Sequence, residues 1–301
     1  MFVINHRNIF FAISGLLVIA SVVAITLFGL KPSVDFTGGS IIEVEFASST
    51  PDTALVATAL TEAGFDNALI RTSDANELNI RTRPLAEGDR DTIIAALEKV
   101  GGPLTVERLS SVGPTVGEEL RRKTTIAIIL VVLMTILYIA FTFRKVSKPI
   151  SSWMYGIVAI LTLLHDVIIP AGVFAILGHF AGLEADTLFV VALLTILGVS
   201  INDTIVVFDR IRENLGLLGD RASQGFAETV GKSLEQTYAR SFNTSFTIVL
   251  VLAVLFFLGG PTIHSFMLTL LVGQIAGTYS SIFIASPLLV VIANRKLKSQ
   301  K

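Results

Sequence analysis

One stretch of this chain places an ionisable side chain inside a long apolar run. Residues 198–204 read GVSINDT, so Asp203 stands beside the polar side chains of Ser200, Asn202 and Thr204. A charged residue in the middle of a membrane helix costs on the order of 2.5 to 3.5 kcal/mol on insertion scales, and such residues face protein or water. We therefore predict that Asp203 belongs to a functional site inside the membrane. The alternative is that Asp203 only hydrogen-bonds neighbouring helices near the interface.

A second polar site is the adjacent pair His165 and Asp166, which Pro170 follows in the same apolar run. Successive residues of a helix differ by about 100°, so the two side chains are not expected to point at one partner. Proline removes a backbone donor, which predicts a kink. We favour a structural or packing role for this pair. Metal binding is not expected, because no further ligand lies at a suitable spacing.

Arg240 opens the fifth apolar stretch on the face where the fourth stretch ends. Asp203 and Arg240 are therefore predicted to lie at similar depth and to form an ion pair. The alternative is that Arg240 only anchors its helix at the membrane boundary, with its charged end extended to water.

The elements that carry these residues are those of a membrane protein. Hydrophobic residues make up 52% of the 301 and charged residues only 16%, where a soluble domain has roughly 25% charged residues. A helix needs about 20 apolar residues to cross a bilayer. Six stretches approach or exceed this length: 9–30, 124–143, 150–177, 187–208, 242–258 and 266–293.

The first stretch is predicted to be a retained anchor, because it is longer than a signal-peptide core and ends without an Ala-x-Ala site. Short segments rich in lysine and arginine stay cytoplasmic. They carry His6, Arg7, Arg144, Lys145, Lys148, Arg210, Arg212, Arg221, Lys232, Arg295, Lys296, Lys298 and Lys301. Both termini are therefore predicted to be cytoplasmic and residues 31–123 to be extracytoplasmic.

Residues 31–123 alternate strand-like and helical patterns. We predict strands at 40–46, 68–72, 77–82 and 104–112, with one helix that starts at Pro51 and ends just before Gly64 and another at 89–100. Thr50 is the expected cap of the first helix, and residues 73–76 are expected to form a hairpin turn. The order βαββαβ is the ferredoxin-like arrangement, an α+β fold.

The remaining membrane segments suggest packing rather than chemistry. Small residues recur at steps of four in the last span, where they let another backbone approach closely: Gly273, Gly277, Ser281 and Ala285. The loop 209–236 places Phe226, Val230 and Leu234 on one face, which predicts a helix at the membrane surface. The chain thus divides into 1–30, 31–123, 124–293 and a cytoplasmic tail at 294–301.

Several classes of function are not expected. A net charge of -1 gives no basic field for nucleic acid. The absence of cysteine excludes thiol nucleophiles and cysteine-ligated metals. No serine–histidine, paired-aspartate or zinc constellation indicates an enzyme. No cofactor is predicted, and protons are the expected coupling ion.

Four segments resemble the SecF family, a branch of the RND superfamily of proton-coupled transporters. They are residues 34–39 (VDFTGG), 112–117 (VGPTVG), the pair His165 and Asp166, and 198–214 (GVSINDTIVVFDRIREN). The resemblance covers nearly the whole chain and the six-helix topology.

This resemblance implies a transport subunit of the bacterial cytoplasmic (inner) membrane rather than an enzyme. It implies a SecDF heterodimer with SecD, docking on the SecYEG channel with YajC as a further partner, and use of the proton motive force to move preproteins outward. The resemblance also implies a proton relay through the family's helix 4 acid and helix 5 arginine, which correspond to Asp203 and Arg240. RND-type folds have two six-helix halves, so a partner must supply the other half. The alternatives are an RND-like exporter of lipids or small hydrophobic molecules, which would need an apolar cavity in a larger outer domain, and a structural assembly factor.

Overall fold

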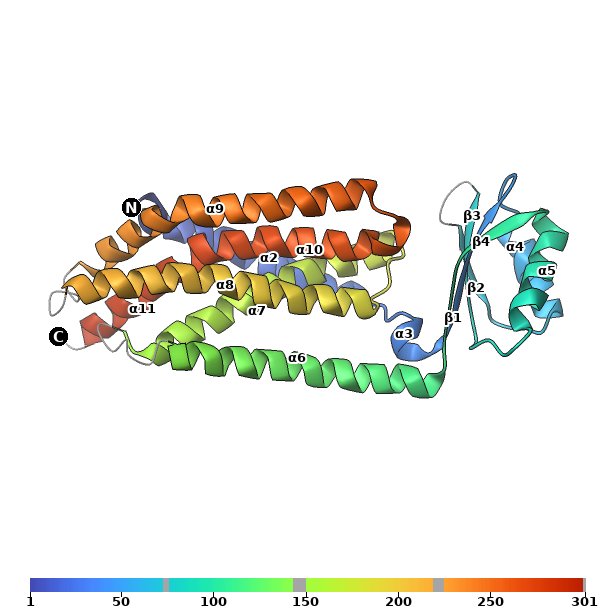
Figure 1. Ribbon diagram of the computed structural model, residues 1–301, viewed down its shortest axis with the longest axis horizontal. Helices are drawn as coiled ribbons and strands as arrows, with labels where there is room; N and C mark the ends of the chain where they lie inside the picture. Colours follow the sequence, from blue (N-terminus) through green and yellow to red (C-terminus); the bar gives the residue numbers. More distant parts are fainter. Residues whose placement is uncertain (73–75, 143–149, 219–224, 300–301) are drawn as a thin grey trace. The chain divides into compact units, whose positions relative to one another are not determined.

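The structure is a computed structural model that describes residues 1–72, 76–142, 150–218 and 225–299 (Figure 1). It contains two compact units. One comprises Met1–Lys31 with Ala127–Lys301, and the other is Pro32–Ile126.

The smaller unit, which we call the outer domain, is a four-stranded sheet with two helices on one face (Figure 1). The sheet order is β2-β3-β1-β4, and each neighbouring pair is antiparallel. This order confirms the ferredoxin-like prediction. The elements are α3 (Val34–Thr37), β1 (Gly39–Phe46), α4 (Thr53–Glu62), β2 (Leu69–Thr72), β3 (Glu77–Thr82), α5 (Asp89–Gly101) and β4 (Leu104–Val112).

The alternation of β1 explains the core of the outer domain. Ile42, Val44 and Phe46 are buried toward the helices, while Glu43 and Glu45 face away from them. Buried residues of α4, of the connection after it, of β3 and of α5 complete this cluster: Val56, Leu60, Phe65, Leu78, Ile80, Ile93 and Leu97.

Helix α4 of the outer domain begins at Thr53, two residues later than the predicted start at Pro51. Asp52 caps α4, because its Oδ1 accepts a hydrogen bond from the Ala54 amide at 2.9 Å. The prediction of Thr50 as the cap was therefore wrong. A carboxylate two residues before a backbone amide satisfies one of the unpaired donors at a helix start.

Two glycines, Gly38 and Gly39, form the turn that leads into β1. Gly38 has φ 73° and Gly39 has φ 127°, a region that L-residues rarely adopt. A Cβ on Gly38 would approach Cα of Pro114 at 3.0 Å, and one on Gly39 would approach the Thr82 carbonyl oxygen at 3.0 Å. Glycine is therefore required by both conformation and space.

Within the described residues, six helices are long and apolar enough to cross a membrane. The chain is therefore a multi-pass membrane protein, as predicted. A short helix, α1 (Phe2–Asn5), precedes them. The spans are α2 (Arg7–Phe28), α6 (Pro114–Thr142), α7 (Ser152–Phe180), α8 (Thr187–Leu218), α9 (Phe226–Leu258) and α10 (Pro261–Ser280), which continues through the π-helix η2 (Ser281–Ala285) into α11 (Ser286–Ser299).

The predicted surface helix is instead the first part of α9. Phe226, Val230 and Leu234 are 3%, 0% and 5% exposed, and they join a buried cluster with Phe208 of α8. Their apolar face therefore packs on protein rather than on the membrane surface. The same helical extension carries α8 to Leu218 and starts α6 at Pro114, well beyond the apolar stretches themselves.

α7 continues through Pro170 as one helix. Some predictions lie outside the described residues. These are most of the hairpin turn, residues 73–75, and the basic residues Arg144, Lys145, Lys148, Arg221 and Lys301.

Candidate functional site

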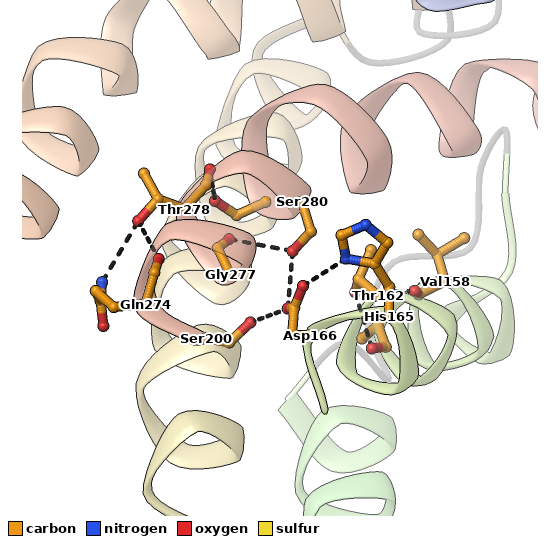
Figure 2. Close-up of polar contacts among 11 residues, drawn as sticks. Val158, Thr162, His165, Asp166, Ser200, Gln274, Gly277, Thr278 and Ser280 are labelled. Atoms are coloured by element: carbon orange, nitrogen blue, oxygen red, sulfur yellow. Dashed lines mark hydrogen bonds and ion pairs between the residues drawn. The ribbon is translucent and has the colours of Figure 1, made fainter. Parts of the chain in front are cut away.

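Asp166 of α7 lies at the centre of a polar cluster that joins three helices (Figure 2). Its side chain is 0% exposed. Oδ1 contacts Nδ1 of His165 at 2.8 Å, and Oδ2 accepts a hydrogen bond from Ser280 of α10 at 2.8 Å. Ser200 of α8 donates a short hydrogen bond to the same Oδ2. A carboxylate without water needs such donors, because an unsatisfied buried charge is very costly.

His165 and Asp166 contact each other, which the sequence reading did not anticipate. Because successive residues of a helix differ by about 100° around its axis, the two side chains otherwise have different neighbours. The His165 ring stacks on Tyr279 of α10, with ring centroids 6.4 Å apart. Asp166 instead reaches between α8 and α10. The pair therefore shares one internal contact while facing two different interfaces.

Glycines of α10 allow α8 to come close enough for this cluster to form. A Cβ added to Gly273 would lie 2.1 Å from Cδ1 of Ile196, and one on Gly277 would lie 3.0 Å from Cβ of Ser200. Close helix approach through small residues is the usual packing mode in membranes. The Gly277 contact thus places Ser200 within reach of Asp166.

Ser281 and Ala285, the other two small residues of the predicted ladder, are each 0% exposed. They bound the π-helix η2, where the extra residue per turn changes which side chains face the bundle. Ser280, which precedes η2, was missed by the sequence reading. Its position three residues after Gly277 was the available signal, because i and i+3 share a helix face.

Asp203 occupies a second, less crowded site. It is 6% exposed, and its Oδ2 accepts a hydrogen bond from Ser245 of α9 at 3.2 Å. Thr204 is buried next to it, whereas Asn202 is exposed and points away from the bundle. The motif of residues 198–204 therefore serves two sites, with Ser200 at Asp166 and Asp203 facing α9.

The expected ion pair between Asp203 and Arg240 is not formed among the described residues. Asp203 is level with Ser245, which lies five residues beyond Arg240 along α9. Five residues displace Arg240 by about 7.5 Å along the axis and by about 140° around it. Arg240 is consequently exposed on the outer face of α9. The sequence placed Arg240 at the depth of Asp203 because Arg240 was taken as the start of its helix. In the structure α9 already begins at Phe226, so Arg240 does not mark the helix end.

Comparisons with known protein families agree with the architecture. Residues 92–295 match the family "Protein export membrane protein SecD/SecF, C-terminal", and residues 23–50 match the "SecD/SecF GG Motif". The second match contains Gly38 and Gly39, the pair with positive φ.

Curated relatives match along nearly their whole length. A "Protein translocase subunit SecF" of Thermobaculum terrenum is 40% identical over 97% of this chain and 94% of the relative. A protein of the same description from Anaerolinea thermophila is 38% identical over 96% and 93%.

Solved structures give the same result. A crystal structure of SecDF, a translocon-associated membrane protein from Thermus thermophilus, is 35% identical with a TM-score of 0.81 over 97% of this chain. This chain spans 38% of that longer SecDF chain. SecDF in a "Super-membrane-facing form" matches with a TM-score of 0.69 at 35% identity, over 99% of this chain and 39% of the other. The fold, the glycine pair at the start of β1 and the full-length matches together show that this chain belongs to the SecF family.

Proposed function

We propose that this chain is the SecF-type subunit of the Sec export machinery, which acts with SecD to move preproteins across the cytoplasmic membrane. Its similarity to proteins described as translocase subunits supports this role. Its match to 38% of a SecDF chain supports a partnership with SecD, because the longer chain has room for a second half. In this proposal the pair docks on the SecYEG channel, with YajC as a further partner.

The proposed orientation has both termini in the cytoplasm and the outer domain on the opposite side. The basic residues of the short segments support it, because positive charges are retained on the cytoplasmic side. Of these, Arg210 and Arg212 are described, and they form pairs with Glu213 and Asp209 at 2.6 Å at the cytoplasmic end of α8.

The proton motive force drives this subunit through Asp203, in our proposal. The observation that carries it is a carboxylate 6% exposed inside a spanning helix and held by a single hydrogen bond. A group with so few partners can change them between conformations, and a proton can drive a cycle only if it binds two conformations differently. Arg240 completes the relay from the exposed face of α9, which a SecD half would cover.

The exporter alternative receives less support. It needs a ligand cavity in the outer domain, whose described interior is occupied by a continuous cluster of buried apolar side chains.

The test uses inverted vesicles that contain the complete export complex. Asp203→Asn keeps the side-chain shape and can still accept from Ser245, but it cannot bind a proton. We expect loss of the gradient-stimulated part of preprotein translocation with normal assembly. The matched control is Asp209→Asn, which makes the same change six residues further along α8 at an exposed ion pair. Asp203→Asn vesicles that respond like wild type when the gradient is collapsed would contradict the proposal.

A further inference from the structure

The His165 ring has a second nitrogen that the Asp166 cluster does not use. Nδ1 contacts Asp166, while Nε2 is buried and has no hydrogen-bond partner in the described part of the chain. Figure 2 shows this nitrogen on the side of the ring away from Asp166. The whole side chain is 6% exposed. An unpaired polar atom buried at such a site destabilises the fold unless a bound water satisfies it.

The packing of α2 on α7 identifies what lies beside this ring. Phe28 stacks on His179 at 4.5 Å, and a Cβ on Gly172 would come within 2.3 Å of Ser21. Ser21 and Phe28 are seven residues apart on α2, and their partners Gly172 and His179 are seven residues apart on α7. The two helices therefore run parallel, with the same spacing between successive contacts. Seven residues earlier, the same register places Ser14 level with His165.

Ser14 is the second unpaired group at this level. It is 6% exposed, and its Oγ is buried without a partner among the described residues. An independent contact ties the same turn of α2 to the histidine. Tyr279, whose ring stacks on His165, donates a hydrogen bond to the carbonyl oxygen of Phe10 at 3.0 Å. Two unsatisfied polar atoms therefore lie at the same level of the α2–α7 packing, a setting in which a water can bridge them.

We propose that His165 and Asp166 form a second proton-binding site, which exchanges its proton at Nε2 across the α2–α7 interface. With Asp166 ionised, its oxygens only accept hydrogen bonds, so neutral His165 carries its hydrogen on Nδ1 and presents Nε2 as an acceptor. A proton arriving at Nε2 through a water held by Ser14 gives an imidazolium beside a carboxylate. Release from Nε2 restores the starting state. One proton is bound and one released, with no other bond changed.

The surroundings suit this exchange. Ser200 and Ser280 fix the Asp166 carboxylate, so the negative charge stays in place while the histidine changes its charge. Of the titratable groups on helices packed against α7, Tyr279 of α10 is the one in contact with the ring.

The other charged groups on those helices face elsewhere. Asp203 of α8 is directed to Ser245 of α9, and the further charges of α8 begin at Asp209. Arg7 begins α2, and Arg295 lies near the end of α11. His264 of α10 lies near the start of that helix, where its ring contacts Phe256 of α9. Among the described residues, no charged group other than Asp166 forms an ion pair or hydrogen bond with the His165 ring.

Proton binding at this site can be measured directly on the intact complex. The chain has four histidines, so nitrogen-15 spectra of labelled histidine can be assigned by single substitutions. We expect one signal to change between the neutral Nδ1–H form and the imidazolium as pH falls. His165→Asn should remove that signal, Asp166→Asn should shift its midpoint, and Ser14→Ala should slow its exchange. His179→Asn, in the same helix, should leave it unchanged.

The role of the site in export rests on the proposed function, but its proton binding does not. A His165 signal that stays in one protonation state throughout the pH range in which the complex remains folded would overturn the inference, even if Asp203→Asn abolishes gradient-driven export. Conversely, a titrating His165 together with a gradient-insensitive Asp203→Asn phenotype would sink the proposed function alone. Because the wild-type spectrum carries the test, a variant that fails to fold does not obscure it.

Discussion

The membrane bundle buries polar side chains and exposes large apolar ones to a degree that the outer domain does not. In the outer domain the interior is apolar, and charges such as Arg83 and Asp89 pair at the surface at 2.7 Å. In the bundle Asp166 and Ser280 are fully buried, whereas Leu27 and Phe257 are more than two-thirds exposed. The solvent explains the reversal, because water expels apolar groups and lipid cannot satisfy polar ones.

The difference teaches where stability comes from in each unit. Apolar burial stabilises the outer domain, whereas helices in lipid gain little from it, since lipid chains are as apolar as leucine. Close approach at Gly273 and Gly277 and hydrogen bonds to Asp166 must therefore hold α7, α8 and α10 together. A polar network that supports the bundle can also move protons through it.

The largest effect is expected from removing apolar volume in the outer domain. Leu97 of α5 is 0% exposed, so Leu97→Ala should lower the free energy of unfolding of this domain by about 3 kcal/mol. Amide exchange of β1 and β3 in the complete chain measures this loss. Leu55→Ala, at a position 59% exposed on α4, should change it by less than about 0.5 kcal/mol. Equal effects of the two would break the comparison.

A smaller loss is expected from the acid at the centre of the bundle. Asp166→Ala removes the contacts of the carboxylate with His165, Ser200 and Ser280, although Ser280 can still donate to the carbonyl oxygen of Gly277. Losing these contacts in a membrane protein should cost about 2 kcal/mol. Asp203→Ala removes only the Ser245 bond and should cost about 1 kcal/mol or less. Unfolding of the purified complex in mixed micelles measures both. Similar losses would show that Asp166 does not hold the helices.

The outer domain was largely predictable from the sequence. Alternation in β1 and the glycine after α4 give strands and helices within a few residues of those observed, because water imposes a strict inside–outside pattern. The helix start was misplaced, since Thr50 and Asp52 are both good caps and only the backbone decides between them. The number of membrane spans was also predictable, because each span is a long run of apolar residues.

The membrane site was less predictable. Apolar length does not reveal where a helix ends when polar turns continue it, which is why Arg240 was placed at the depth of Asp203. Local sequence also gives no contact between helices, so the convergence of Ser200 and Ser280 on Asp166 was not foreseen. The sequence favoured Asp203 over Asp166 as the functional acid because Asp203 corresponds to the family's helix 4 acid. In the structure both acids are buried and have hydrogen-bond partners.

The smallest effect is expected at Glu43, a half-buried carboxylate on the helix-free face of the sheet. Partial burial raises the pKa of Glu43 above its ordinary value near 4.5, and Arg108, 3.9 Å away, offsets part of this. A raised folded-state pKa contributes stability below the ordinary value that is lost as pH rises through the raised one. Ionised Glu43 is therefore slightly unfavourable at neutral pH.

Glu43→Gln should accordingly stabilise the outer domain at neutral pH by less than about 1 kcal/mol, because solvent screens a partly exposed group. It should also remove part of the stabilisation seen on acidification.

Asp89 provides the opposite sign, since the Ala86 amide and then Arg83 lower the pKa of Asp89. Asp89→Asn should lower stability at neutral pH, and this loss should fade as pH falls through the acid range. Amide exchange of β1 as a function of pH follows both variants. If both variants lowered stability at neutral pH, the attraction of Arg108 would outweigh the effect of burial at Glu43. Polar contacts would then stabilise this face of the sheet, as hydrogen bonds to Asp166 stabilise the bundle.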